Sequence, residues 1–103
     1  MRQGLINDTE KVIHNELVWS YDEHTKFLSP HDGYAIILEE VEEAAEELEK
    51  VEAELKCIWI NIKNNQLADT RSLHQYAKLL ACEAVQVAAM AKKFEESTKE
   101  WRG

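Results

Sequence analysis

The chain has few of the residues that interrupt helices or cross-link a small fold. Its 103 residues include three glycines, one proline and two cysteines. The segment between Gly33 and Gly103 contains no proline and no further glycine, which favours long helices. Two cysteines are too few for a disulfide framework, so we expect Cys57 and Cys82 to be reduced and partly buried thiols.

Other absences exclude whole classes of function. No apolar run approaches the roughly 18 residues that a membrane span needs, and the N-terminal residues lack the apolar core of a signal peptide. Twenty acidic against 12 basic residues give a net charge of −8, which disfavours binding to nucleic acid or anionic membrane. We therefore expect a cytoplasmic protein without either partner. An anionic small substrate stays open, because bound cations reverse the local charge.

The hydrophobic pattern predicts three helices in a single domain that spans residues 1–103. The first covers about residues 6–27, with Asn7 or Asp8 as its cap, and ends before Pro30. The second begins at Ser29 and runs for some 28 residues, or about 42 Å. Its apolar residues alternate at spacings of three and four, close to a coiled-coil seam. They are Tyr34, Ile37, Val41, Ala44, Leu48, Val51, Leu55, Ile58 and Ile62.

The third helix follows a stop at Lys63-Asn64-Asn65. It begins near Ser72, which forms a capping box with Gln75, or earlier, near Gln66. It is apolar on nearly every side, which predicts burial that a three-helix monomer cannot supply. The pattern therefore predicts an all-α protein: an antiparallel helical bundle built on a long helix hairpin and completed by oligomerisation, as a homodimer or homotetramer. The charged tail from Lys92 onward is expected to fray.

Two polar pairs stand out among the apolar residues of the long helices. Glu40 and Glu43 are three residues apart and project side by side from a helix, as do Glu83 and Gln86. The midpoint between the pairs falls at Lys63, so a hairpin that turns there brings them to the same height. An oxygen-rich pocket of this kind suits Mg²⁺. The same glutamates also fit the exposed face of an acidic helical-bundle interaction protein.

The motifs around these pairs resemble those of MazG-like nucleotide pyrophosphohydrolases, particularly the short phage and bacterial members. The segment from Pro30 to Glu43 resembles the first motif, with E-E-x-x-E at Glu39, Glu40 and Glu43. The segment from Glu83 to Phe94 is similar to the second motif of the same branch. Glu42 to Glu46 also satisfies E-E-x-x-E, but the preceding His-Asp-Gly-Tyr-Ala favours the register that begins at Glu39.

The resemblance implies an all-α nucleoside triphosphate pyrophosphatase with a role in nucleotide-pool house-cleaning. Such an enzyme hydrolyses an NTP or dNTP to the monophosphate and pyrophosphate with Mg²⁺, or Mn²⁺ as an alternative. Carried over by position, Glu40, Glu43 and Glu83 are metal ligands, and Gln86 occupies the fourth ligand position. Glu39 is the catalytic carboxylate that supports the attacking water.

Substrate contacts are predicted more loosely. Lys93 and Lys78, on the same helix as Glu83, are candidates for phosphate contacts, and Trp19 for stacking on the base. The sequence departs from the wider family, whose second motif is E-x-x-D, because Gln86 replaces the aspartate and removes one negative charge. The two motifs are also further apart than in compact members. These departures motivate an alternative function, a catalytically weakened homologue that acts as an oligomeric nucleotide-binding or regulatory protein.

Overall fold

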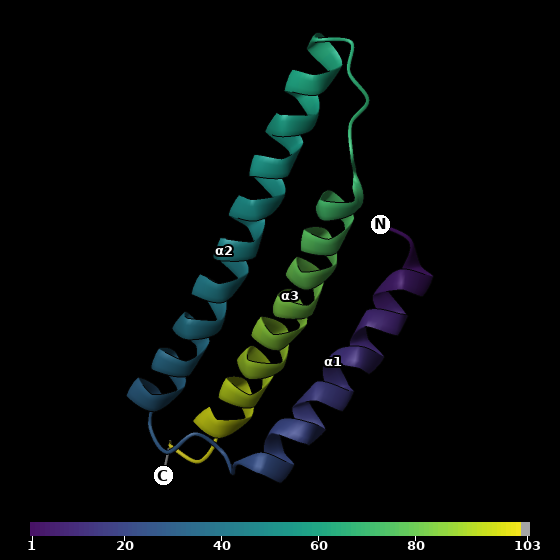
Figure 1. Ribbon diagram of the computed structural model, residues 1–103. Coiled ribbons are helices and arrows are strands. Elements are labelled where there is room, and N and C mark those ends of the chain that lie inside the picture. The colour runs from purple at the N-terminus through teal and green to yellow at the C-terminus, as the bar shows by residue number, and fades with distance from the viewer. Residues whose placement is uncertain (102–103) are drawn as a thin grey trace.

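The computed structural model describes residues 1–101 and contains three α-helices (Figure 1). They are α1 (Gln3–Glu23), α2 (Pro30–Lys63) and α3 (Arg71–Thr98), and no strand occurs among the described residues. The all-α prediction is confirmed. Helix α3 lies in the middle, packs against α2 on one side and α1 on the other, and runs antiparallel to α2.

The start of α2 follows the predicted signals. The Ser29 side chain accepts a hydrogen bond from the Asp32 amide at 3.1 Å, and Pro30 occupies the first turn. The Asp32 carboxylate in turn accepts from the Leu28 amide at 3.1 Å. Helix α2 is longer than predicted, at 34 residues, and it ends where Asn65 adopts a positive φ of 55°. Asparagine tolerates this left-handed conformation better than most residues.

Three predictions for α1 were wrong. The helix begins at Gln3 rather than near residue 6, and neither Asn7 nor Asp8 caps it. It ends at Glu23 rather than at Phe27, because the chain must leave the helix for the Phe27 side chain to be buried. The Phe27 amide then donates to the Ser97 hydroxyl at 3.2 Å, which fastens the α1–α2 connection to α3.

Two predictions for α3 were also wrong. Thr70 precedes the helix without a side-chain cap, so the predicted capping box at Ser72 does not form. Arg71 instead pairs with Asp69 at 2.8 Å. The C-terminal segment does not fray at Lys92, since α3 continues through Thr98 and buries Ser97 completely.

The hydrophobic core is small and lies near the end of the bundle where α1 and α2 are connected. Its buried apolar members are Leu17, Phe27, Ala89 and Met90. The Phe94 ring packs against Phe27 and, edge-on, against Trp101. The Cα radius of gyration is 17.7 Å, whereas a compact domain of about 100 residues has about 13 Å. A single layer of three helices therefore leaves broad faces open.

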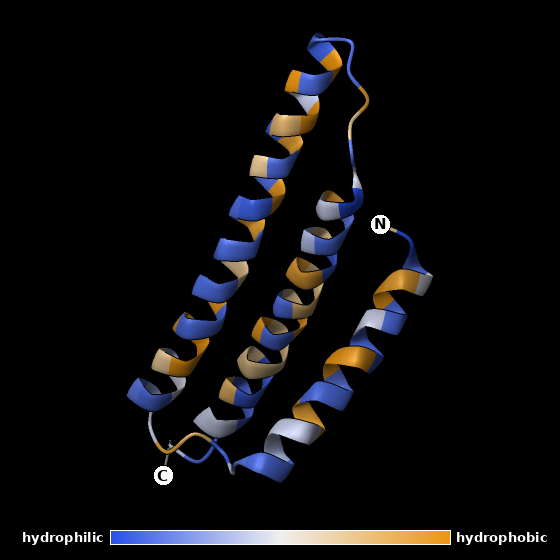
Figure 2. Ribbon diagram, in the orientation of Figure 1, coloured by the Kyte–Doolittle hydropathy of each residue, from blue (hydrophilic) through white to orange (hydrophobic). Residues whose placement is uncertain are grey.

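Figure 2 shows apolar residues that extend over much of α2, including its far end beyond α3. The predicted apolar seam divides in two, because α3 covers only one side of α2. Ile37, Ala44, Val51 and Ile58 are half-buried, whereas Tyr34, Val41, Leu48, Leu55 and Ile62 are exposed. The two cysteines are free as predicted, but both are exposed rather than partly buried. Within residues 1–101 no helix is long and apolar enough to cross a membrane.

Gly33 makes a contact that a larger residue would prevent. A Cβ atom added at Gly33 would overlap the Phe94 ring and press on Phe27, whereas one at Gly4 meets only the Arg2 guanidinium at 3.7 Å. We expect Gly33→Ala to lower the free energy of unfolding by about 1–3 kcal/mol through overpacking. Gly4→Ala is the matched control, and its better helix propensity leaves stability unchanged or slightly raised. Thermal denaturation of both variants measures this, and equal melting temperatures would contradict the contact.

Candidate metal centre

Three carboxylates from two helices meet between α2 and α3. Glu40 and Glu43 lie one turn apart on α2, and Glu83 faces them from α3; one oxygen of each lies within 4.8 Å of the others. Glu40 and Glu83 are half-buried, while Glu43 is exposed. Residues forty positions apart in the sequence are thus brought together by the antiparallel packing of the two helices.

The cluster carries unfavourable electrostatics. The pKa of Glu40 is raised by burial and then by the charges of Glu43 and Glu83. The pKa of Glu83 is raised by burial, then by the charge of Glu43 and by a hydrogen bond with it. One oxygen of Glu83, Oε2, is fully buried and has no hydrogen-bond partner among residues 1–101. A hard divalent cation fits this donor set, since carboxylate oxygens are the ligands that Mg²⁺ and Mn²⁺ prefer.

Gln86 lies one turn beyond Glu83 and is held by a residue of α1. Its side-chain amide donates to Glu16 Oε1 at 2.6 Å, so only its carbonyl oxygen is left to offer a cation. The charge of Glu16 also contributes to the raised pKa of Glu40. Sequence reasoning missed Glu16. The signal was present, because Glu16 is a carboxylate beside Ile13, Leu17 and Ser20 on the face of α1 that packs on α3.

Glu47 also lies beside the cluster and is half-buried. Its side chain is 15% exposed, and one of its oxygens is buried without a partner. The other accepts from Lys50 at 3.2 Å. The charge of Glu47 contributes to the raised pKa of Glu83. Glu39, the predicted catalytic carboxylate, is exposed next to Glu40 and adds to the raised pKa of Glu40.

Lys93, a predicted candidate for a phosphate contact, is buried, with 2% of its area exposed. Its ammonium donates to the Ser20 hydroxyl at 2.9 Å and to the backbone carbonyls of His24 and Ser20 at 3.3 and 3.5 Å. The rings of Tyr21 and Phe27 lie 5.0 and 5.2 Å from the nitrogen. Burial lowers the pKa of Lys93. The lysine therefore holds the C-terminal end of α1 against α3, where carbonyl groups favour a cation.

A cavity of about 340 Å³ opens beside Lys93. Its walls include the apolar side chains of Phe27, Ile36 and Met90 and the carboxylate of Asp32. Ile36 lies one helical turn before Glu40, so the cavity adjoins the carboxylate cluster along α2.

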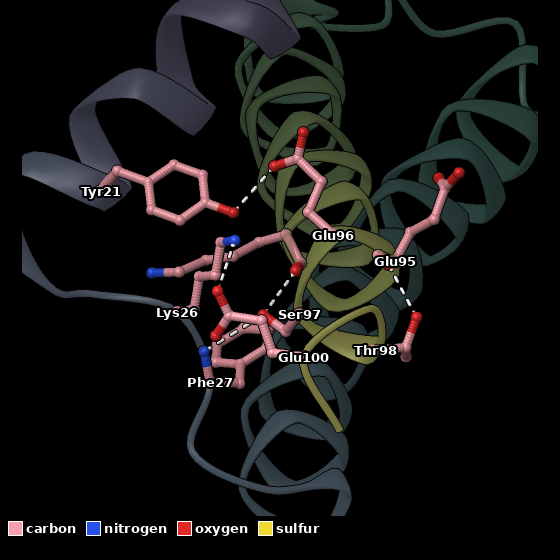
Figure 3. Close-up of polar contacts among 9 residues, drawn as sticks. Tyr21, Lys26, Phe27, Glu95, Glu96, Ser97, Thr98 and Glu100 are labelled. Carbon is pink, nitrogen blue, oxygen red and sulfur yellow. Dashed lines mark hydrogen bonds and ion pairs between the residues drawn. The ribbon is translucent and has the colours of Figure 1, made fainter. Parts of the chain in front are cut away.

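Polar contacts fix the connecting segment around this end of the bundle (Figure 3). The Tyr21 hydroxyl donates to Glu96 at 2.8 Å, and burial, with the carboxylate of Glu96, raises the pKa of Tyr21 to about 12. Lys26 forms an ion pair with Glu100 at 2.8 Å. The first contact joins α1 to α3, and the second joins the segment after α1 to the residues that follow α3, so both hold this end of the bundle together.

The remaining predicted substrate residues lie away from this cavity. Lys78 lines a separate groove of about 480 Å³ between α1 and α3, together with Glu16 and Gln86. Trp19 is 57% exposed on α1 and lines neither the cavity nor the groove. Its role in base stacking stays a prediction.

No family model, no curated protein and no solved structure matches this chain. Function is therefore inferred from the geometry of the carboxylates and from the two sequence motifs that contain them.

Repulsion within the cluster predicts a trade-off between stability and metal binding. Without metal, Glu83→Gln should raise the melting temperature by about 2–5 °C, because it removes one of three facing charges. Saturating Mg²⁺ should stabilise the wild-type protein, by about 2.7 kcal/mol at a concentration 100 times the Kd, but not the variant. Glu46→Gln, on the exposed face of α2, is the control and should behave as wild type. An equal Mg²⁺ response in all three proteins would contradict the site.

Proposed function

We propose that the chain is a Mg²⁺-dependent, MazG-like nucleoside triphosphate pyrophosphohydrolase of nucleotide-pool house-cleaning. It would convert an NTP or dNTP to the monophosphate and pyrophosphate. The observation that carries the proposal is the meeting of Glu40, Glu43 and Glu83 within 4.8 Å. The two resembling motifs place metal ligands at these positions. The first motif contributes Glu40 and Glu43 from α2, and the second contributes Glu83 from α3.

Each residue has a chemical role in this proposal. Glu40, Glu43 and Glu83 hold Mg²⁺, or Mn²⁺, and the carbonyl oxygen of Gln86 adds a neutral ligand. The bound ion neutralises phosphate charge and lowers the pKa of a water molecule. Glu39, exposed beside Glu40, orients the attacking water and accepts its proton. Glu16 fixes the Gln86 amide and adds negative charge near the position where the wider family has an aspartate.

The cavity beside Lys93 is our choice for the nucleoside. Its apolar walls suit a base, and its volume of about 340 Å³ is within the range for small-molecule pockets. Asp32 supplies an acceptor for the polar edge of a base, and Lys93 contributes its aliphatic stem to the wall, because its ammonium is already held by Ser20 and His24. Lys93 thus acts at the base rather than at a phosphate, and Lys78 stays the candidate for a phosphate contact, because its groove includes Gln86.

A second candidate function is favoured by Gln86. An amide in place of an aspartate removes a charge from the metal site, and its N–H is already occupied by Glu16. A homologue weakened in this way would bind nucleotides without turnover, as an oligomeric regulatory protein. Under either function we expect association into a homodimer or homotetramer, which the exposed apolar residues of α2 support.

Pyrophosphate release from a panel of ribo- and deoxyribonucleoside triphosphates tests the proposal. With Mg²⁺, the wild-type protein should turn over at least one member of the panel. Glu43→Gln should reduce the rate by at least about 100-fold, because it removes charge stabilisation at the reacting phosphate.

The matched control separates the two possible registers of the first motif. Glu46 belongs to the E-E-x-x-E that begins at Glu42, and it is exposed. Glu46→Gln should therefore keep the wild-type rate. Binding without turnover across the whole panel would select the regulatory alternative, and neither binding nor turnover would refute both.

A further inference from the structure

A second apolar seam runs along α2 on a side that α3 does not cover. It consists of Leu38, Val41, Ala45, Leu48, Glu52, Leu55, Trp59 and Ile62, and we call it the outer seam. The spacing alternates between three and four, which is the 3.5-residue period of helices that pack along their length on another helix. Its six large apolar side chains are between 40% and 57% exposed.

No described element covers the outer seam. Helix α3 packs on the neighbouring face of α2, which contains the half-buried Ile37, Ala44, Val51 and Ile58. Helix α1 packs on α3 rather than on α2. An apolar stripe of this length, interrupted at Glu52, indicates an interaction surface rather than a solvated face on a small acidic protein.

Charged residues along one edge of the outer seam indicate which partner fits it. Glu42, Glu49, Lys56 and Lys63 recur every seven residues on that edge, and all four are exposed. The first two are acidic and the last two basic. If a second copy of α2 packs on the seam in antiparallel orientation, the basic half of its edge lies against the acidic half of the edge of the first copy.

Only one register satisfies both charge pairs. Glu49 faces Lys56 of the second copy and Glu42 faces Lys63 of the second copy when the two-fold axis passes between Glu52 and Ala53. A shift of one heptad in one direction places Glu49 against itself, and a shift in the other direction places Lys56 against itself. A parallel pair would instead leave the charges of this edge without opposite partners.

The same register also matches side-chain sizes across the seam. Numbers of residues at the same level add up to 105, so Trp59, the largest seam residue, lies between Ala45, the smallest, and Leu48 of the second copy. Glu52 lies beside Glu52 of the second copy at the axis, and Lys56, one turn further along each helix, can hold its carboxylate at the edge. Large against small is the pattern that fills a helix–helix contact evenly.

We propose that the outer seam of α2 is the interface of an antiparallel homodimer in this register. The partner is a second copy of the same chain, selected by the acidic and basic halves of the Glu42–Lys63 edge. The proposal is independent of the proposed hydrolase activity, because none of the seam or edge residues belongs to the carboxylate cluster.

Charge exchange tests the interface and its register by sedimentation equilibrium in low salt. The variant K56E/K63E makes the edge wholly acidic, and E42K/E49K makes it wholly basic. Each alone should dimerise at least about tenfold more weakly than wild type, since four attractive pairs become repulsive. An equimolar mixture of the two should form heterodimers, and the fourfold variant E42K/E49K/K56E/K63E should recover the wild-type homodimer.

Two controls keep the result specific. E10K/E23K changes the net charge as much as E42K/E49K does but lies on exposed positions of α1, so it should not weaken the dimer. Circular dichroism should show the same helix content in every variant, because all substituted positions are exposed. A monomeric wild-type protein would overturn the interface. Double variants that dimerise as wild type does, or a mixture that stays monomeric, would overturn the register.

Discussion

The close approach of Gly33 to Phe94 sets the height at which α2 packs on α3, and the candidate site depends on that height. Glu43 lies ten residues after Gly33 along α2, and Glu83 lies eleven residues before Phe94 along α3. Because the helices run antiparallel, these nearly equal separations bring both glutamates to about the same level. A glycine contact at one end of the helix pair thus determines that the carboxylates meet a third of the way along α2.

Repulsion among the three carboxylates lowers the free energy of unfolding, and the small hydrophobic core offsets little of that loss. Burial and neighbouring carboxylates raise the pKa values of Glu40 and Glu83, while the buried apolar core has four members among the described residues. A cation at the cluster and a second copy on the outer seam would each supply stabilisation that the isolated chain lacks. The same sequence features that weaken the monomer are therefore those on which the proposed metal site and the proposed dimer depend.

Some features could be predicted from the sequence because they depend on local signals. The helices and the start of α2 at Ser29 follow from scarce glycine and proline and from a capping pattern. The position of Lys93, the partner of Gln86 and the burial of Glu47 could not, since each depends on which face of one helix meets another. The single apolar seam predicted for α2 also failed for this reason, because periodicity cannot tell one covered face from two adjacent ones.

The most direct test of the metal centre is a crystal structure of the protein with Mn²⁺, analysed by anomalous scattering. Mn²⁺ takes the same oxygen ligands as Mg²⁺ but scatters anomalously, so its position can be assigned without ambiguity. The account predicts an anomalous peak between Glu40, Glu43 and Glu83, bound directly by all three carboxylates. A peak elsewhere on the acidic surface of α2, or none at saturating Mn²⁺, would contradict it.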